Sequence, residues 1–393
     1  MQKKTILRIC HKYLINNDGY DLDVQDLCKS TSKTYNNYVI AYLNKSSSEY
    51  IKDNKLIKKG KFYYHPATKT KIYFIKYKIK SNNYLKDLYK LNKIKIFLKA
   101  FKEIYDIIKP DILHVHGTLL YQYLYAAKYA KGKSKVIATH HIGLINQNYI
   151  KQNLIILIAK YIIHNLFPLY SNKIVCVSNY GKKSFSLFKK NIVVINPIPL
   201  IPKVNISNFN KIIRKNVLNN KFKVTKKDNF FCLIGRICEQ KNQLKTIKAF
   251  NEIIQLNPNY KLIIIGEIKN QEYYKKLIKE INKKIDNYCI IGNINNKEVI
   301  KIIEKSQGLI TISNNEGLGR NAMEARLLGK PIIASKNSGY EDFIQNKRNG
   351  YLVNQNRSAE IINAIKNIKK LSINNNYSHQ DYIKEIKKIY NGK

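Results

Sequence analysis

The sequence has no tryptophan, no Cys-x-x-Cys pair and few acidic residues. Its six cysteines are scattered, and most lie inside apolar runs. That spacing argues against a metal or redox site and favours small core residues in a reducing compartment. Acidic residues number 26 against 71 lysines and arginines, so the formal net charge is +45. This charge is the first property of the sequence that indicates a binding partner.

Three kinds of partner suit so cationic a chain: nucleic acid, an anionic membrane surface and polyanionic small molecules. The lysines are spread along the sequence, and no recognised nucleic-acid motif stands out. We therefore expect no specific nucleic-acid partner. Attraction to an anionic membrane surface and a merely solvated lysine surface stay open as readings of the charge.

The sequence also lacks an apolar run long enough to span a bilayer comfortably. Residues 153–170 are the most hydrophobic stretch, but Lys160, His164, Asn165 and Pro168 interrupt it. Such a segment either packs as a helix of the amino-terminal domain or lies flat in the membrane interface. The amino terminus reads as a charged first strand and not as a signal peptide. We expect a cytoplasmic protein, peripheral on the inner face of the membrane.

With 393 residues, the chain exceeds the size at which one core usually keeps growing, so two domains are expected. Strand-like runs lie at 4–10, 37–43, 72–77, 112–117, 136–141 and 173–178, and again at 230–237, 261–266, 288–292, 308–313 and 331–335. They are continuously apolar and alternate with helical patterns such as 91–108, 120–130 and 244–256, which is typical of parallel sheets covered on both faces. The predicted fold class is α/β, with two doubly wound, Rossmann-like domains.

The proline-rich stretch 196–202 breaks both helix and sheet, and a polar, lysine-rich stretch follows it. The predicted organisation is an amino-terminal, acceptor-side domain over 1–200, a linker over 201–227 and a donor-binding domain over 228–378. A carboxy-terminal helix over 379–393 can cross back to the first domain.

The most informative segment, residues 313–329, reads SNNEGLGRNAMEARLLG and lies between two predicted strands. Its loop follows a strand and precedes a helix, where open α/β sheets bind ligands and helix N–H groups favour anions. Glu316 and Glu324 bracket this loop. They could be ordinary surface charges, but with the glycines between them they favour a ligand that carries both phosphate and hydroxyl groups. A sugar nucleotide fits that description.

A second loop comes from residues 233–243, where a predicted strand ends at Gly235. Without a side chain at that position, the backbone can approach a ligand closely. Arg236 and Lys241 supply two cations just before the next predicted helix. Such a pair suits a diphosphate, whose departure requires neutralisation of the developing charge.

The segment 313–333 matches the pattern Ser-x-x-Glu-Gly-x-Gly-x-x-x-x-Glu-Ala-x-x-x-Gly-x-Pro-Val-Ile at nearly every marked position. This pattern, together with the Gly-Arg…Lys loop, resembles the retaining glycosyltransferases of family 4. The resemblance is strong over 225–355 and weaker over 104–200. It implies the GT-B fold, in which two doubly wound domains face each other across a cleft.

By this resemblance, Glu316 would accept hydrogen bonds from hydroxyls of the donor sugar, and Glu324 from the ribose. Arg236 and Lys241 would hold the diphosphate, so no metal and no cofactor are expected besides the nucleotide sugar itself. The remaining donor-binding positions would be Gly235 and the backbone of Gly317, Leu318, Gly319, Arg320 and Asn321.

His141, with His116, would face the donor sugar or the acceptor. A zinc site built from the histidines at 114, 116, 140 and 141 is the weighed alternative, but no acidic residue stands ready to complete it. Family members usually carry a paired-glycine loop after the first strand. Here the corresponding residues 14–22 contain only Gly19, which leaves the acceptor side less well defined than the donor side.

The resemblance thus implies a retaining hexosyltransferase. It would move a hexose from a nucleotide-diphosphate sugar to a hydroxyl of a cell-surface glycan: a capsule, a lipopolysaccharide or a lipid-linked oligosaccharide. An epimerase acting on nucleotide sugars with the same fold, or a basic nucleic-acid-binding protein, are the alternatives.

Overall fold

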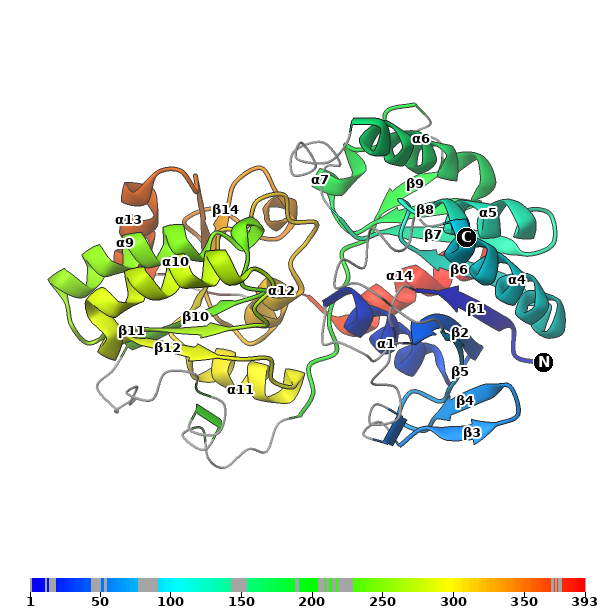
Figure 1. The fold of residues 1–393 in the computed structure, drawn as a ribbon, viewed down its shortest axis with the longest axis horizontal. Helices are drawn as coiled ribbons and strands as arrows, with labels where there is room; N and C mark the ends of the chain where they lie inside the picture. The colour runs from blue at the N-terminus through cyan, green and yellow to red at the C-terminus, as the bar shows by residue number, and fades with distance from the viewer. Residues whose placement is uncertain are drawn as a thin grey trace. The chain divides into compact units, whose positions relative to one another are not determined.

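A computed structural model of the chain divides into two compact units (Figure 1). Unit 1 comprises Met1–Pro197 together with Ser378–Lys393, and unit 2 comprises Ile198–Tyr377. The structure describes residues 2–10, 13, 19–43, 51–52, 55–76, 91–142, 154–187, 191–203, 209, 212–213, 217, 229–368, 371, 373 and 377–392. Unit 2 begins at Ile198, just before the linker expected over 201–227. Most of that linker lies outside the described residues.

Unit 1 is built on a nine-stranded sheet with the order β3-β4-β5-β2-β1-β6-β7-β8-β9. The strands are β1 Thr5–Ile9, β2 Asn36–Leu43, β3 Ile57–Lys59, β4 Phe62–His65, β5 Thr70–Lys76, β6 Ile112–His116, β7 Lys135–His140, β8 Lys173–Cys176 and β9 Ile192–Val194. All neighbouring pairs from β5 to β9 in this order are parallel, and β3 and β4 add an antiparallel edge. The order β5-β2-β1-β6-β7-β8 is that of a doubly wound, dinucleotide-binding sheet.

Helices cover both faces of this sheet. The layer of α4 Leu91–Ile108, α5 Tyr121–Ala130 and α6 Leu154–Tyr170 buries aromatic residues such as Phe97, Phe101 and Phe167. On the other face, α1 Gly19–Thr31 contacts the carboxy-terminal helix α14 His379–Asn391, which belongs to unit 1 although it follows unit 2 in sequence. A short helix, α7 Asn179–Lys182, follows β8.

Unit 2 is a six-stranded, wholly parallel sheet with the order β12-β11-β10-β13-β14-β15. Its strands are β10 Asn229–Ile234, β11 Tyr260–Ile265, β12 Tyr288–Ile291, β13 Leu309–Thr311, β14 Ile332–Ser335 and β15 Gly350–Val353. Its α-helices are α9 Gln243–Leu256, α10 Gln271–Ile281, α11 Asn296–Lys305, α12 Arg320–Leu327 and α13 Ser358–Asn367, with 3-10 turns at η1 Glu239–Lys241, η2 Asn282–Asn287 and η3 Gly339–Asp342. Helices α9, α10 and α13 pack together on one face, and α11 contacts α12.

The predicted α/β class with doubly wound sheets is confirmed in both units. Every strand-like run of the sequence becomes a strand, and α4 has the predicted bounds. Five of the six cysteines are buried and none of them forms a disulfide, as expected for core residues; Cys238 is half-buried. The sequence pattern does not predict the strands β3, β4, β9 and β15 or the helices α1, α7 and α13, most of which are short or carry a mixed polar pattern.

Candidate active site

The donor-side residues gather at one edge of the unit 2 sheet. The strand order reverses between β10 and β13, and their carboxyl ends continue into the two loops that the sequence singled out. In doubly wound sheets, ligands bind outside the carboxyl ends of the strands at this switch point. Gly235 and Arg236 directly follow β10, Lys241 closes η1, and Glu316 lies in the loop between β13 and α12.

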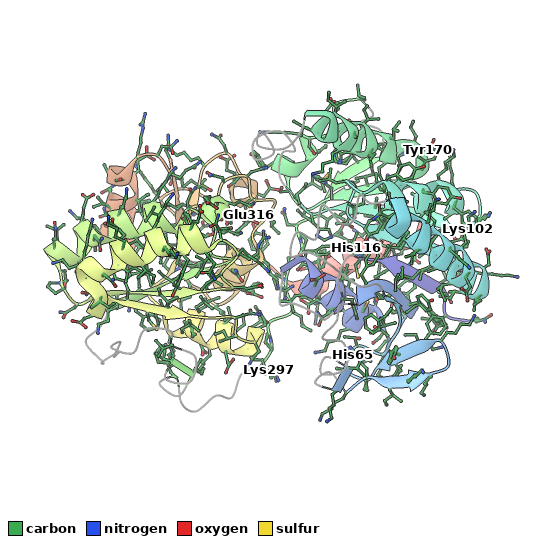
Figure 2. All side chains as sticks on the ribbon, viewed as in Figure 1. His65, Lys102, His116, Tyr170, Lys297 and Glu316 are labelled. Carbon is green, nitrogen blue, oxygen red and sulfur yellow. The ribbon has the colours of Figure 1, made fainter. Side chains whose placement is uncertain are left out.

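The clearest contact in the site joins Lys241 to Glu316. The Nζ atom of Lys241 lies 2.6 Å from the Oε2 atom of Glu316, and both side chains are more than four-fifths buried (Glu316 is labelled in Figure 2). Of the cations proposed for a diphosphate, Arg236 is exposed and bonds Gln240 at 3.5 Å. The Lys241 ammonium group and the Glu316 carboxylate are thus in direct contact, although 75 residues separate them in sequence.

Glu324 is more deeply placed than Glu316. It sits on α12 with its side chain 1% exposed, and its Oε1 atom accepts hydrogen bonds from Arg320 Nε at 2.9 Å and Asn296 Nδ2 at 3.0 Å. Asn296 is the first residue of α11, so two helices meet at this carboxylate. Both of these donors bond the same oxygen, Oε1, of the Glu324 carboxylate.

The loop carrying Glu316 is held against η3 by two glycines. Gly319 has φ +82°, and a Cβ atom there would stand 2.3 Å from the Tyr340 ring. A Cβ atom on Gly339 would stand 1.6 Å from the carbonyl oxygen of Gly317, and the Gly339 amide donates to the Glu316 carbonyl at 3.0 Å. No side chain larger than hydrogen fits at these contacts, so the glycines fix where the Glu316 backbone lies.

Amide side chains join the two loops to each other. Asn242, in the left-handed conformation directly after Lys241, donates to the carbonyl of Ile312 and to the side chain of Asn314, each at 2.9 Å. The backbone amide of Asn314 donates to the Gln240 carbonyl at 2.8 Å. The loop after β10 and the loop after β13 therefore form one unit, which keeps Lys241 and Glu316 together.

The other predicted donor-side residues follow the same loop into α12. Gly317 and Leu318 are buried, whereas Gly319, Arg320 and Asn321 are half-buried. Asn321 donates to the carbonyl of Ile234 at 3.4 Å, which connects the start of α12 to the end of β10. Glu341 accepts a hydrogen bond from the Asn337 backbone amide at 2.7 Å and so has a structural contact in η3.

The unit 1 residues named by the sequence come together at the corresponding edge of the other sheet. His116 ends β6, and its Nδ1 atom lies 3.1 Å from Nε2 of His141 (His116 is labelled in Figure 2). Tyr20, the residue after Gly19 at the start of α1, contacts the His141 ring edge-on and donates to the His116 carbonyl at 3.2 Å. Burial lowers the pKa of His141 to about 3, so it is neutral at physiological pH. The other residues expected around Gly19, 14–18, lie outside the described part.

The remaining histidines form structural contacts. His114 is buried between Tyr390 Oη at 2.8 Å and Thr139 Oγ1 at 2.7 Å, as a satisfied core position. His140 and His164 share the hydroxyls of Thr118 and Ser184. Within the described residues, no three His, Cys, Asp or Glu side chains are grouped as metal ligands.

Sequence reasoning missed several residues that shape the site: Asn242, Asn296, Tyr340 and Tyr20. The αL-prone asparagine after Lys241 and the Gly339-Tyr340 pair were available signals. Asn296 gave no signal, because its partner Glu324 lies 28 residues away.

Comparison with known proteins agrees with this geometry. Residues 214–389 match the family model described as glycosyl transferases group 1. Over this segment, a little under half of the chain, the sequence is similar to the group 1 glycosyltransferases. The uncharacterized glycosyltransferase MJ1069 of Methanocaldococcus jannaschii is 24% identical over 99% of both chains. The UDP-Gal:alpha-D-GlcNAc-diphosphoundecaprenol alpha-1,3-galactosyltransferase of Escherichia coli is 25% identical over 68% of this chain and 69% of its own length. Alignments with several other relatives span less than half of those proteins.

The solved structures show the fold of the chain. The crystal structure of Anabaena Alr3699/HepE in complex with UDP and glucose has a TM-score of 0.73 and 15% identity, covering 99% of this chain and 100% of that one. The predicted GT-B fold is confirmed by this likeness. The Glu316 loop and the Lys241 loop both lie inside the segment that matches the family model.

Proposed function

We propose that this glycosyltransferase is a retaining hexosyltransferase that uses a nucleoside-diphosphate hexose. The paired Lys241 and Glu316 carry the proposal, because a cation and a carboxylate side by side suit a ligand whose diphosphate adjoins a hydroxyl-bearing ring. The Anabaena structure holds UDP and glucose, which is the same ligand chemistry on the same fold.

In the proposed reaction, the bond between the anomeric carbon and the diphosphate oxygen breaks, and its electron pair leaves with the diphosphate. Arg236 and Lys241 stabilise the charge that develops there, a type of contact whose loss typically slows a reaction by about 10²–10³-fold. The acceptor hydroxyl attacks the same face of the sugar, and its proton passes to the departing phosphate oxygen. The configuration at the anomeric carbon is thereby retained.

Glu316 and Glu324 take hydroxyl groups in this proposal. Glu316 would accept from the sugar and Glu324 from the ribose, with Arg320 or Asn296 giving up a hydrogen bond to make room. The backbone amides around Gly319 at the start of α12 would face phosphate oxygens, as the positive end of a helix favours. No metal is required where two side-chain cations serve the diphosphate.

The acceptor is proposed to be a cell-surface glycan or a lipid-linked precursor. The E. coli relative is named for transfer to a diphosphoundecaprenol-linked sugar, and the charge of +45 suits work at an anionic membrane. His116, His141 and the start of α1 at Gly19 are the proposed acceptor-side residues. A neutral His141 can exchange hydrogen bonds with a sugar hydroxyl without carrying a charge.

A panel of nucleotide sugars tests the donor first. Thermal unfolding is measured with each compound, since a bound donor stabilises the folded protein by mass action. The most stabilising donor is then incubated with lipid-linked acceptors, and the product's anomeric configuration is determined by NMR. The same assay with a chelating agent tests metal independence, for which full activity is expected.

Glu316→Gln is the informative variant, because it removes the charge at constant shape. We expect transfer to fall by about 10²-fold or more, the scale of losing a charged hydrogen bond in the transition state. Glu304→Gln, which breaks the surface pair with Lys301 at 2.7 Å on α11, is the matched control and should transfer at the wild-type rate. Equal transfer by wild type and Glu316→Gln would overturn the site assignment.

A further inference from the structure

Helix α6 in unit 1 packs Phe167 into the core, but it also buries three polar residues and exposes several apolar ones. Its polar members Lys160, His164 and Asn165 are at most 2% exposed. Its well-exposed residues include Ile158 at 50% and Ile162 at 49%. A helix that only covers a sheet in water has polar residues on its outer face, so the exposed apolar residues of α6 need a separate explanation.

The buried polar residues are held by specific bonds. His164 lies between the hydroxyls of Thr118 at 2.8 Å and Ser184 at 3.0 Å. The side-chain oxygen of Asn165 accepts hydrogen bonds from the backbone amides of Ser186 at 3.0 Å and Leu187 at 3.2 Å. These contacts fix the rotation of α6 about its axis, so the helix cannot turn its apolar side inward without breaking them.

We define the α6 outer face as Ile158, Tyr161, Ile162, Leu169 and the adjacent Leu187, which are 39% to 62% exposed. Positions 158, 162 and 169 lie in one stripe at helical spacing. Leu187 joins the stripe because its backbone is bonded to Asn165. Of the large apolar side chains that are well exposed among the described residues, nine belong to unit 1 and one, Leu256, to unit 2.

The chain segment that forms this face carries charge of one sign. Residues 112–197, which contain α5, α6 and α7, include 11 lysines and no aspartate or glutamate. Lys131 on the outside of the α5 end donates to the Leu169 carbonyl at 2.9 Å, and Lys128 and Lys131 both lie within 6 Å of the Tyr170 ring at the end of α6 (Tyr170 is labelled in Figure 2). A protein partner of mixed charge would not require so complete an exclusion of carboxylates.

From these observations we infer that the α6 outer face lies in the interface of an anionic lipid bilayer. The isoleucine and leucine side chains would enter the acyl boundary, and the lysines at the two ends would contact acidic headgroups. No helix among the described ranges is long and apolar enough to cross a membrane, so the helix would lie in the membrane plane. The inference deepens the proposed lipid-linked acceptor but uses no residue of the donor site.

Vesicle co-sedimentation of the full chain tests it, with phosphatidylcholine vesicles that contain or lack phosphatidylglycerol. Ile158→Ser/Ile162→Ser should lower the partition constant for the anionic vesicles at least tenfold, and Leu256→Ser on unit 2 should leave it unchanged. Lys182→Gln/Lys183→Gln, just before the segment bonded to α6, should weaken anionic binding more than Lys275→Gln/Lys276→Gln on α10. Stabilisation by the nucleotide-sugar donor should be the same in all variants, which separates this test from that of the donor site.

Three results would overturn the inference. The first is equal binding by the wild type and Ile158→Ser/Ile162→Ser. The second is equal binding to both vesicle types. The third is a dimer of the wild type in sedimentation velocity that is absent in the Ile158→Ser/Ile162→Ser variant, which would assign the face to a second copy of the chain. Loss of vesicle binding with an unchanged donor response would support it. Loss of the donor response in every variant, the wild type included, would instead count against the proposed function.

Discussion

Acid should unfold unit 1 before unit 2, because all eight histidines of the chain lie in unit 1. His114, His116 and His164 are at most 1% exposed, and burial lowers the pKa of each well below the usual value. Above the pKa that a histidine has in the unfolded chain, near 6.5, a buried neutral histidine leaves the stability of the fold undiminished. That stability is lost as the pH falls from about 6.5 toward the folded-state pKa.

The size of the effect follows from proton linkage. At pH 5, a histidine that stays neutral in the folded state and titrates near 6.5 when unfolded costs about 2 kcal/mol. Three such residues cost about 6 kcal/mol, which is comparable to the whole stability of many domains. In unit 2, hydrogen bonds from Lys283 and Lys301 lower the pKa of Glu280 and Glu304, respectively. The stability that these two carboxylates contribute is lost only when the pH falls below the ordinary carboxyl pKa.

Pulse-labelling hydrogen exchange with mass spectrometry resolves the two units. The protein is incubated at a series of pH values and then labelled briefly at one common pH. Peptides from β6 and β7 should lose protection between pH 6.5 and 5, while peptides from β10 and β11 keep it. If unit 2 opened first, or both units opened together near pH 4, the buried neutral histidines would not be the acid-labile feature of this protein.

Two substitutions test how the backbone and the carboxy-terminal helix are held. Gly339→Ala places a methyl group 1.6 Å from the Gly317 carbonyl, so donor-induced thermal stabilisation should disappear; Gly292→Ala, where a Cβ meets nothing within 4 Å, should behave as wild type. Tyr390→Phe removes the α14 hydroxyl that bonds His114, and urea unfolding should show a loss of about 1–3 kcal/mol. A wild-type unfolding midpoint for that variant would show that the Tyr390 hydroxyl does not contribute to the docking of α14.

The sequence was sufficient to predict most of the fold because parallel, doubly covered strands are continuously apolar. The run at 261–266 is such a strand, and β11 occupies it almost to the residue. The edge strand β3 could not be predicted from the sequence, because all three of its residues are exposed and no apolar face gives a pattern. Edge strands of this kind are set by the turn and by pairing to a neighbour, which a local pattern does not contain.

The site was predictable to the extent that its chemistry is local in sequence. Glu316, Gly319 and Glu324 lie in one loop and helix, so their proximity follows from the chain itself. The contact of Lys241 with Glu316 depends on β10 and β13 being neighbours in the sheet, which a list of strands does not specify. Likewise the burial of Glu324 by Asn296 depends on the packing of α11 beside α12.

If Lys241 and Glu316 bind the donor as proposed, their bond makes donor binding an exchange. A diphosphate that recruits Lys241 separates it from Glu316 at 2.6 Å, and the carboxylate then needs a new partner. Sugar hydroxyls supply that partner only when the sugar is attached to the diphosphate. A nucleoside diphosphate alone would leave a mostly buried carboxylate poorly satisfied, which costs free energy. The pair therefore favours the intact nucleotide sugar over its separate parts.

This exchange predicts effects of opposite sign in one variant. In Glu316→Gln the lysine has no anionic competitor, so the nucleoside diphosphate should bind several-fold more tightly than to wild type, by about 1 kcal/mol. The nucleotide sugar should bind more weakly, because the amide accepts a weaker hydrogen bond from a hydroxyl than a carboxylate does. Isothermal titration calorimetry with both compounds measures the two changes. If both affinities fell together, Glu316 would support the loop without competing for Lys241, and the exchange would not determine which ligand this site selects.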